Sequence, residues 1–123
     1  MIEVLKAKIH RATVTDANIN YEGSITIYYE LMERAGIHEY EKVSVVNINN
    51  GQRFETYAIK GINENNVICV NGAAARLVSV GDKVIIMTYQ FIDEKQALQH
   101  KPKIILLDDK NRMKSEKCED IFI

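Results

Sequence analysis

The stretch Glu3-Val4-Leu5-Lys6-Ala7-Lys8-Ile9 alternates between apolar and mostly charged side chains. Successive side chains of a β-strand point to opposite faces, so this pattern predicts a strand that is buried on one face only. Lys6, Lys8 and His10 then project together from the polar face. The chain therefore begins with a half-buried strand.

Further short β-rich segments follow this strand. Asn49-Asn50-Gly51 lies between two of them and is a strong hairpin signal. Short helices are predicted at residues 29–35, 73–76 and 93–99, the first closed by Gly36. Many short strands with few helices favour a small closed β-barrel over an α/β sheet. The remaining strands are predicted at residues 24–28, 42–48, 53–60, 67–70, 83–91 and 103–107, and the polar tail from Asp108 is expected to be partly mobile.

Length and composition limit the function. A chain of 123 residues is expected to form one domain. Its 16 basic and 17 acidic residues give a net charge of -1, without a Lys/Arg run that would follow a phosphate backbone, so nucleic acid is not an expected partner. No signal peptide or membrane span is expected, which favours a cytoplasmic protein. Cys69 and Cys118 lack metal-type spacing and are expected to be free thiols, and no metal is predicted.

The pair Gly23-Ser24 opens the second predicted strand. Glycine can take backbone angles closed to other residues, and such angles would leave the Gly23 carbonyl open to attack by the Ser24 hydroxyl. An N-to-O acyl shift and β-elimination would then convert Ser24 into a pyruvoyl ketone. A Gly-Ser pair alone is more often an ordinary turn, so the prediction depends on further motifs.

Four such motifs accompany the pair. They are Lys8-Ile9-His10-Arg11-Ala12 with Val14-Thr15, the segment Asn50 to Ile59, the segment Asn71 to Arg76, and the segment Val80 to Ile86. Together with the Gly-Ser pair these motifs resemble, in order and spacing, the bacterial pyruvoyl-dependent aspartate decarboxylase family over roughly residues 1–107.

The resemblance implies an all-β fold, a closed six-stranded double-psi β-barrel with short helices. It implies a zymogen that forms a single domain of residues 1–123 and cleaves itself between Gly23 and Ser24 into a β chain (1–23) and an α chain (24–123). The family assembles as a cytoplasmic homotetramer with sites between subunits, and a maturation factor is a further expected partner. Its members are carboxy-lyases that convert L-aspartate to β-alanine and CO2 for pantothenate and coenzyme A biosynthesis.

Roles of individual residues also follow from the resemblance. Ser24 becomes the pyruvoyl cofactor, which forms a Schiff base with the substrate, and Tyr57 is the proton donor. Thr56 polarises the Gly23 carbonyl during processing. Arg53, with Lys8, binds the carboxylate that the substrate keeps, in line with the paired charge-assisted hydrogen bonds of a guanidinium.

The Asn71-Gly72-Ala73-Ala74 segment is expected to bind substrate, because small residues admit a ligand close to the backbone. No general base is assigned to Asn20, where some relatives carry histidine. The tail after residue 107 matches no motif.

Two other functions remain open. The chain is alternatively a pyruvoyl decarboxylase of another amino acid, or a non-catalytic double-psi barrel that serves as a binding module. Balanced charge argues against a DNA-binding module, and substrate trials separate the two decarboxylases.

Overall fold

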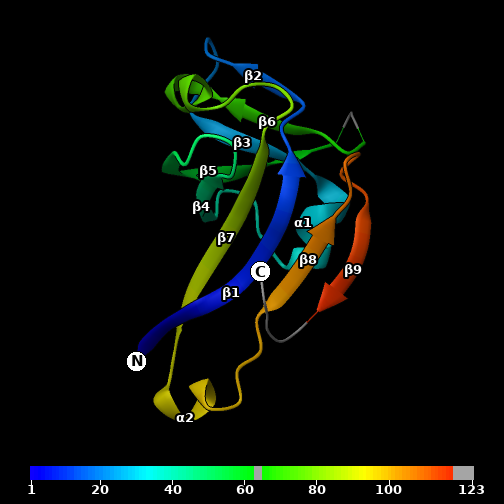
Figure 1. Ribbon diagram of the computed structural model, residues 1–123. Coiled ribbons are helices and arrows are strands. Elements are labelled where there is room, and N and C mark those ends of the chain that lie inside the picture. The colour runs from blue at the N-terminus through cyan, green and yellow to red at the C-terminus, as the bar shows by residue number, and fades with distance from the viewer. Residues whose placement is uncertain (63–64, 118–123) are drawn as a thin grey trace.

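Nine strands form one mixed sheet in the computed structural model, which describes residues 1–62 and 65–117, without the side chains of 115–117. The strand order is β2-β6-β3-β5-β4-β7-β1-β8-β9. Figure 1 shows β1 and β7 side by side along the molecule, with α2 at the opposite end from β2 and β6. The strands are β1 (Ile2–Thr13), β2 (Asp16–Asn18), β3 (Ser24–Tyr28), β4 (Lys42–Asn47), β5 (Arg53–Gly61), β6 (Ile68–Asn71), β7 (Lys83–Ile92), β8 (Lys103–Leu107) and β9 (Met113–Lys117).

The predicted mainly-β class with short helices is confirmed. The helices are α1 (Tyr29–Ala35), the 3-10 helix η1 (Gly72–Leu77) and α2 (Glu94–Ala97). The sheet has more strands than the six expected of the barrel, and its closure into a barrel stays a prediction. Among the described residues, no helix is long and apolar enough to cross a membrane.

Strand β1 confirms the alternation from Ala7 to His10, whereas Val4, Leu5 and Lys6 are all half-buried and the register with β7 shifts between Leu5 and Ala7. Ala7 and Ile9 are fully buried, whereas Lys8 and His10 stay partly exposed. The strand pairs antiparallel with β7 and parallel with β8. Its register with β7 shifts between Ile9 and Ala12, where Arg11 has a φ of 67°. This bulge redirects the side chains of the strand next to His10.

The turn signals are also confirmed. Gly51, with a φ of 76°, lies in the connection between the antiparallel strands β4 and β5. Gly36 ends α1 in the left-handed conformation, and its N–H is directed to the carbonyls of Glu33 and Met32. Both glycines occupy positive φ angles that other residues rarely adopt.

The expectation for the C-terminal region is wrong. Residues 103–107 are not the last strand, because β9 pairs antiparallel with β8. Asp108 accepts hydrogen bonds from the backbone N–H groups of Lys110 and Arg112, which lower the pKa of its carboxyl and order the turn. Residues 108–117 thus form a hydrogen-bonded turn and the strand β9, which the sequence did not predict, and the rest of the tail, with Cys118, lies outside the described residues.

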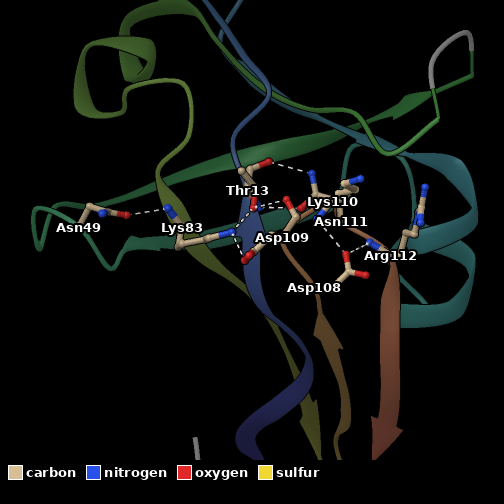
Figure 2. A network of polar contacts seen from close by, with 8 residues as sticks. All are labelled: Thr13, Asn49, Lys83, Asp108, Asp109, Lys110, Asn111 and Arg112. Atoms are coloured by element: carbon tan, nitrogen blue, oxygen red, sulfur yellow. Dashed lines mark hydrogen bonds and ion pairs between the residues drawn. The ribbon is translucent and has the colours of Figure 1, made fainter.

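Asn111 fastens this turn to the rest of the sheet (Figure 2). Its amide donates to the carbonyls of Thr13 and Asn66, at 2.8 and 3.0 Å, and accepts from the Thr13 N–H. Lys83 donates to Asp109 at 2.9 Å and to the Thr13 hydroxyl at 2.6 Å. These contacts connect the end of β1 to the β8–β9 turn.

The core is mostly aliphatic and combines side chains of the sheet with those of α1. Its fully buried side chains include Ile9, Ile25, Ile27, Ile86 and Ile105. Burial of each such side chain favours folding by roughly 1.5–3 kcal/mol. Two of the five belong to β3, so the strand that begins at Ser24 is anchored in the core.

Candidate active site

Ser24 is the first residue of β3 and is 1% exposed. Its strand pairs antiparallel with β6, which places Ser24 opposite Asn71. On its other side β3 pairs in parallel with β5, beginning with Ile25 opposite Ala58. Two neighbouring strands thus fix the position of this hydroxyl, and Ser24 is not a surface turn residue.

Asn71 is the centre of the polar cluster around Ser24. Its Nδ2 donates to Ser24 Oγ and to Thr26 Oγ1, both at 3.0 Å. Its Oδ1 accepts from Cys69 Sγ at 3.2 Å. Ser24 Oγ in turn donates to the carbonyl of Glu22 at 3.2 Å. The Ser24 oxygen is therefore held by one donor and one acceptor.

Gly72 packs against Gly23. Gly72 has a φ of 78°, and a Cβ at this position would lie 2.6 Å from Gly23 Cα. Gly23 lies outside the left-handed region, and the space that its Cβ would occupy is empty. The conformational reason given above for Gly23 is therefore wrong for this chain. The glycine that the site requires sterically is Gly72.

Thr56 and Tyr57 lie on β5 beside the start of β3. In the parallel β3–β5 ladder Ile25 pairs with Ala58. Ser24 directly precedes Ile25 and Tyr57 directly precedes Ala58, so Ser24 and Tyr57 occupy equivalent steps of the ladder. Tyr57 is half-buried, and its ring lies 6.3 Å from that of Tyr40, centroid to centroid. Thr56 is half-buried and projects to the opposite face.

Arg53 and Lys8 lie farther from Ser24 in the sheet. Arg53 is exposed on β5, four residues before Tyr57, or about 13 Å along a strand. Lys8 lies on β1, which β5, β4 and β7 separate from β3. Among the described residues, neither side chain has a hydrogen bond or ion pair to the Ser24 cluster. The structure thus brings Asn71 and Gly72 to Ser24, but not these two cations.

The helical turn predicted after Asn71 is confirmed as η1. Ala73 is exposed and Ala74 packs partly buried against the core. Their contact with a substrate stays a prediction.

A cavity of about 310 Å³ adjoins the cluster. Thr26, Cys69 and Asn71 form part of its wall, together with Tyr21 and Asp16. Sequence reasoning missed Thr26 and Cys69. Alternation would have placed Thr26 on the face of Ser24 and Cys69 on the face of Asn71, but only the β3–β6 register brings the four together.

The fold and this cluster define a small mainly-β protein whose candidate nucleophile is a buried serine. Residues 1–114 match the family model described as aspartate decarboxylase. The chain belongs to the aspartate decarboxylase family.

Curated relatives agree with this assignment. The chain is 64% identical to the aspartate 1-decarboxylase of Caldicellulosiruptor bescii over 91% of this chain and 88% of the relative. It is 66% identical to the aspartate 1-decarboxylase of Caldicellulosiruptor saccharolyticus over 92% of this chain and 88% of the relative. The aspartate 1-decarboxylase of Lactiplantibacillus plantarum is 57% identical over 92% and 87%.

Proposed function

We propose that this protein is an aspartate 1-decarboxylase, a carboxy-lyase that converts L-aspartate to β-alanine and CO2. The product would feed pantothenate and coenzyme A biosynthesis. Relatives that are 57–66% identical carry this name. The observation that carries the proposal is the buried hydroxyl of Ser24, which accepts a hydrogen bond from Asn71. Ser24 directly follows Gly23, and Gly23 packs against Gly72.

The first step of maturation would be an N-to-O acyl shift. Ser24 Oγ attacks the Gly23 carbonyl carbon, a C–O bond replaces the C–N bond, and the hydroxyl proton passes to the released amine. Asn71 holds Oγ at 3.0 Å and limits its rotation. Thr56, on the strand beside Ser24, is proposed to polarise the Gly23 carbonyl.

The second step would release residues 1–23. Loss of the Ser24 α-proton breaks the Cβ–O bond, so that the Gly23 carboxylate leaves. Tautomerisation and hydrolysis of residue 24 then consume one water and release ammonia, which leaves the pyruvoyl group at the start of the α chain (24–123). This group supplies an electron sink for decarboxylation.

The residues around Ser24 fit such a group. Asn71 Nδ2 is a donor in a buried position, and Thr26 and Cys69 complete a small polar lining. Gly72 leaves room for the backbone of Gly23 where any larger residue would collide. Asn71 and Thr26 are the residues proposed to hold the carbonyl oxygen of the mature residue 24.

Substrate binding is proposed to use Arg53 and Lys8 for the carboxylate that aspartate keeps, with the Asn71–Ala74 segment along the substrate. Tyr57 is proposed to return a proton to carbon after CO2 leaves, which its position on the ladder step next to Ser24 supports. The distance between the cation site and residue 24 would select aspartate over glutamate.

Sites between subunits would explain the position of Lys8. The sheet order separates it from Ser24 by three strands within one chain, and a second chain can supply it. Phe91 and Tyr89, which are 63% and 43% exposed on β7, offer apolar surface for such contacts. We therefore propose a cytoplasmic homotetramer of single-domain chains whose sheet closes as a six-stranded double-psi barrel. A maturation factor would act on the uncleaved chain.

A substrate panel tests the proposed function. Purified, matured protein should form β-alanine from L-aspartate, with far less product from L-glutamate or uncharged amino acids. Arg53→Gln should lower kcat/KM for aspartate by about 10- to 100-fold, as expected for loss of charge-assisted hydrogen bonds. Arg112→Gln, at an exposed arginine of the β8–β9 turn, is the matched control. Strong turnover of an uncharged amino acid would contradict the role of Arg53 and favour the alternative decarboxylase.

A further inference from the structure

The thiol of Cys69 contacts the Asn71 amide from the side opposite Ser24. Cys69 Sγ donates to Asn71 Oδ1 at 3.2 Å, while Asn71 Nδ2 donates to Ser24 and Thr26. We infer that Cys69 is a positioning residue for maturation, which fixes the Asn71 amide with its nitrogen toward Ser24. This inference rests on the proposed self-cleavage at Ser24.

The strand register creates this arrangement. Ser24 lies opposite Asn71 and Thr26 lies opposite Cys69 in the antiparallel β3–β6 ladder. Side chains two residues apart on a strand share a face, so these four side chains lie together on one face of the sheet. The Asn71 amide forms hydrogen bonds with the other three.

The contact matters because the two ends of an amide have nearly the same shape but opposite hydrogen-bonding roles. Ser24 and Thr26 carry hydroxyls, which can either donate or accept, so they do not select one orientation of Asn71. Cys69 selects one orientation of the Asn71 amide, because a thiol donates to an oxygen but is a poor acceptor for an N–H. With the amide reversed, its nitrogen would face the thiol.

The orientation of the amide determines what the Ser24 hydroxyl does. In the observed arrangement Oγ accepts from Asn71, and its proton points to the Glu22 carbonyl. A reversed amide would present Oδ1 to Oγ, and the hydroxyl proton would then be drawn toward Asn71. Ser24 Oγ would then turn toward Asn71 its proton, instead of the lone pair that accepts from Nδ2 in the observed arrangement. Asn71 is only 3% exposed, so bulk water does not replace the missing donor.

The test measures the rate of Gly23–Ser24 cleavage in uncleaved protein during warm incubation, by intact mass. Cys69→Val has a similar volume and no donor, and it should cleave about tenfold more slowly, as expected for loss of one hydrogen bond. Cys69→Ser restores a donor and should recover a rate within about twofold of the original chain. Cys118→Val controls for removal of a thiol elsewhere and should leave the rate unchanged.

Melting temperatures separate positioning from damage to the fold. If Cys69→Val melts well below the original chain, Cys69→Ala takes its place in the comparison with Cys69→Ser. Cleavage by the donor-free variant at the original rate would overturn the inference, and so would a Cys69→Ser variant as slow as Cys69→Val. Absence of cleavage in the original chain would instead overturn the proposed function, so the two failures are distinguishable.

Discussion

Gly72 and Gly23 touch across the turn that precedes β3, without room for a side chain between them. A Cβ on Gly72 would lie 2.6 Å from Gly23 Cα and 2.7 Å from Gly23 N, both closer than real Cβ atoms approach. The clash falls on backbone atoms, which cannot rotate away as a flexible side chain would. The position of the Gly23–Ser24 bond thus depends on a glycine 49 residues later in the chain.

The first prediction concerns this contact. Gly72→Ala should displace the Gly23 backbone and slow cleavage at least tenfold, in addition to a cost of about 1 kcal/mol for a non-glycine residue at positive φ. Gly51→Ala is the matched control, because Gly51 has a similar φ of 76° but open space around its missing Cβ. Both variants should lose stability in thermal unfolding, but only Gly72→Ala should lose cleavage. Equal cleavage rates would refute the steric role of Gly72.

The second prediction concerns the buried amide of Asn111, which is 1% exposed. Its three side-chain hydrogen bonds join the β8–β9 turn to Thr13 and Asn66, and its removal should lower the free energy of unfolding by roughly 2–5 kcal/mol. Asn111→Gly tests this best, because Asn111 has a φ of 60° that glycine accepts without strain. Denaturant titration measures the loss. A change in the free energy of unfolding below about 0.5 kcal/mol would contradict a stabilising role for the Asn111 hydrogen bonds.

The third prediction concerns Tyr28, whose hydroxyl donates to the backbone carbonyl of Asn111 and so joins the same group of contacts. Burial raises the pKa of Tyr28 to about 12, with Glu30 and Asp108 adding to the shift. The folded chain therefore holds the phenolic proton more tightly than the unfolded chain does. Stability from this group is complete below pH 10 and is lost as pH rises toward 12. Tyr28→Phe should flatten the decline of the unfolding free energy over that range, and an unchanged slope would contradict this.

The fourth prediction concerns His10, which lies at the bulge of β1. Burial lowers its pKa below the ordinary value of 6.5, and the nearby charges of Lys8 and Arg11 lower it further. The unfolded chain then binds the proton more readily, so the free energy of unfolding should fall as pH drops through 6.5 toward the folded-state pKa. His10→Gln should reduce this slope, whereas the exposed His38 provides a control in His38→Gln. Identical slopes in all three proteins would contradict the prediction.

Local patterns predicted much of the fold. The alternation of residues 3–9, the Asn49–Gly51 connection and Gly36 each depend on a few neighbouring residues. The structure confirms the last two, and it confirms the alternation from Ala7 onward. Strands β2 and β9 were missed because their pairing depends on distant contacts. The turn before β9 depends on Asn111, whose amide contacts Thr13, 98 positions earlier.

The site was predicted less evenly. Ser24, Asn71 and Gly72 belong to motifs, and the structure brings them together. Thr26 and Cys69 were missed because their roles arise from cross-strand register, which the composition of either strand does not reveal. Lys8 and Arg53 lie apart from the Ser24 cluster in one chain, and their roles in substrate binding stay predictions.

Intact mass spectrometry of the purified 14.1 kDa chain and of its Ser24→Ala variant, after prolonged warm incubation, tests the central claim most directly. The account predicts that the original chain divides into residues 1–23 and 24–123. The larger fragment should be lighter by one ammonia than a fragment that begins with serine, and should react with carbonyl reagents. The Ser24→Ala variant should stay intact. An original chain that stays whole even after addition of extract from its host, or a variant that cleaves equally well, would contradict self-processing at Ser24.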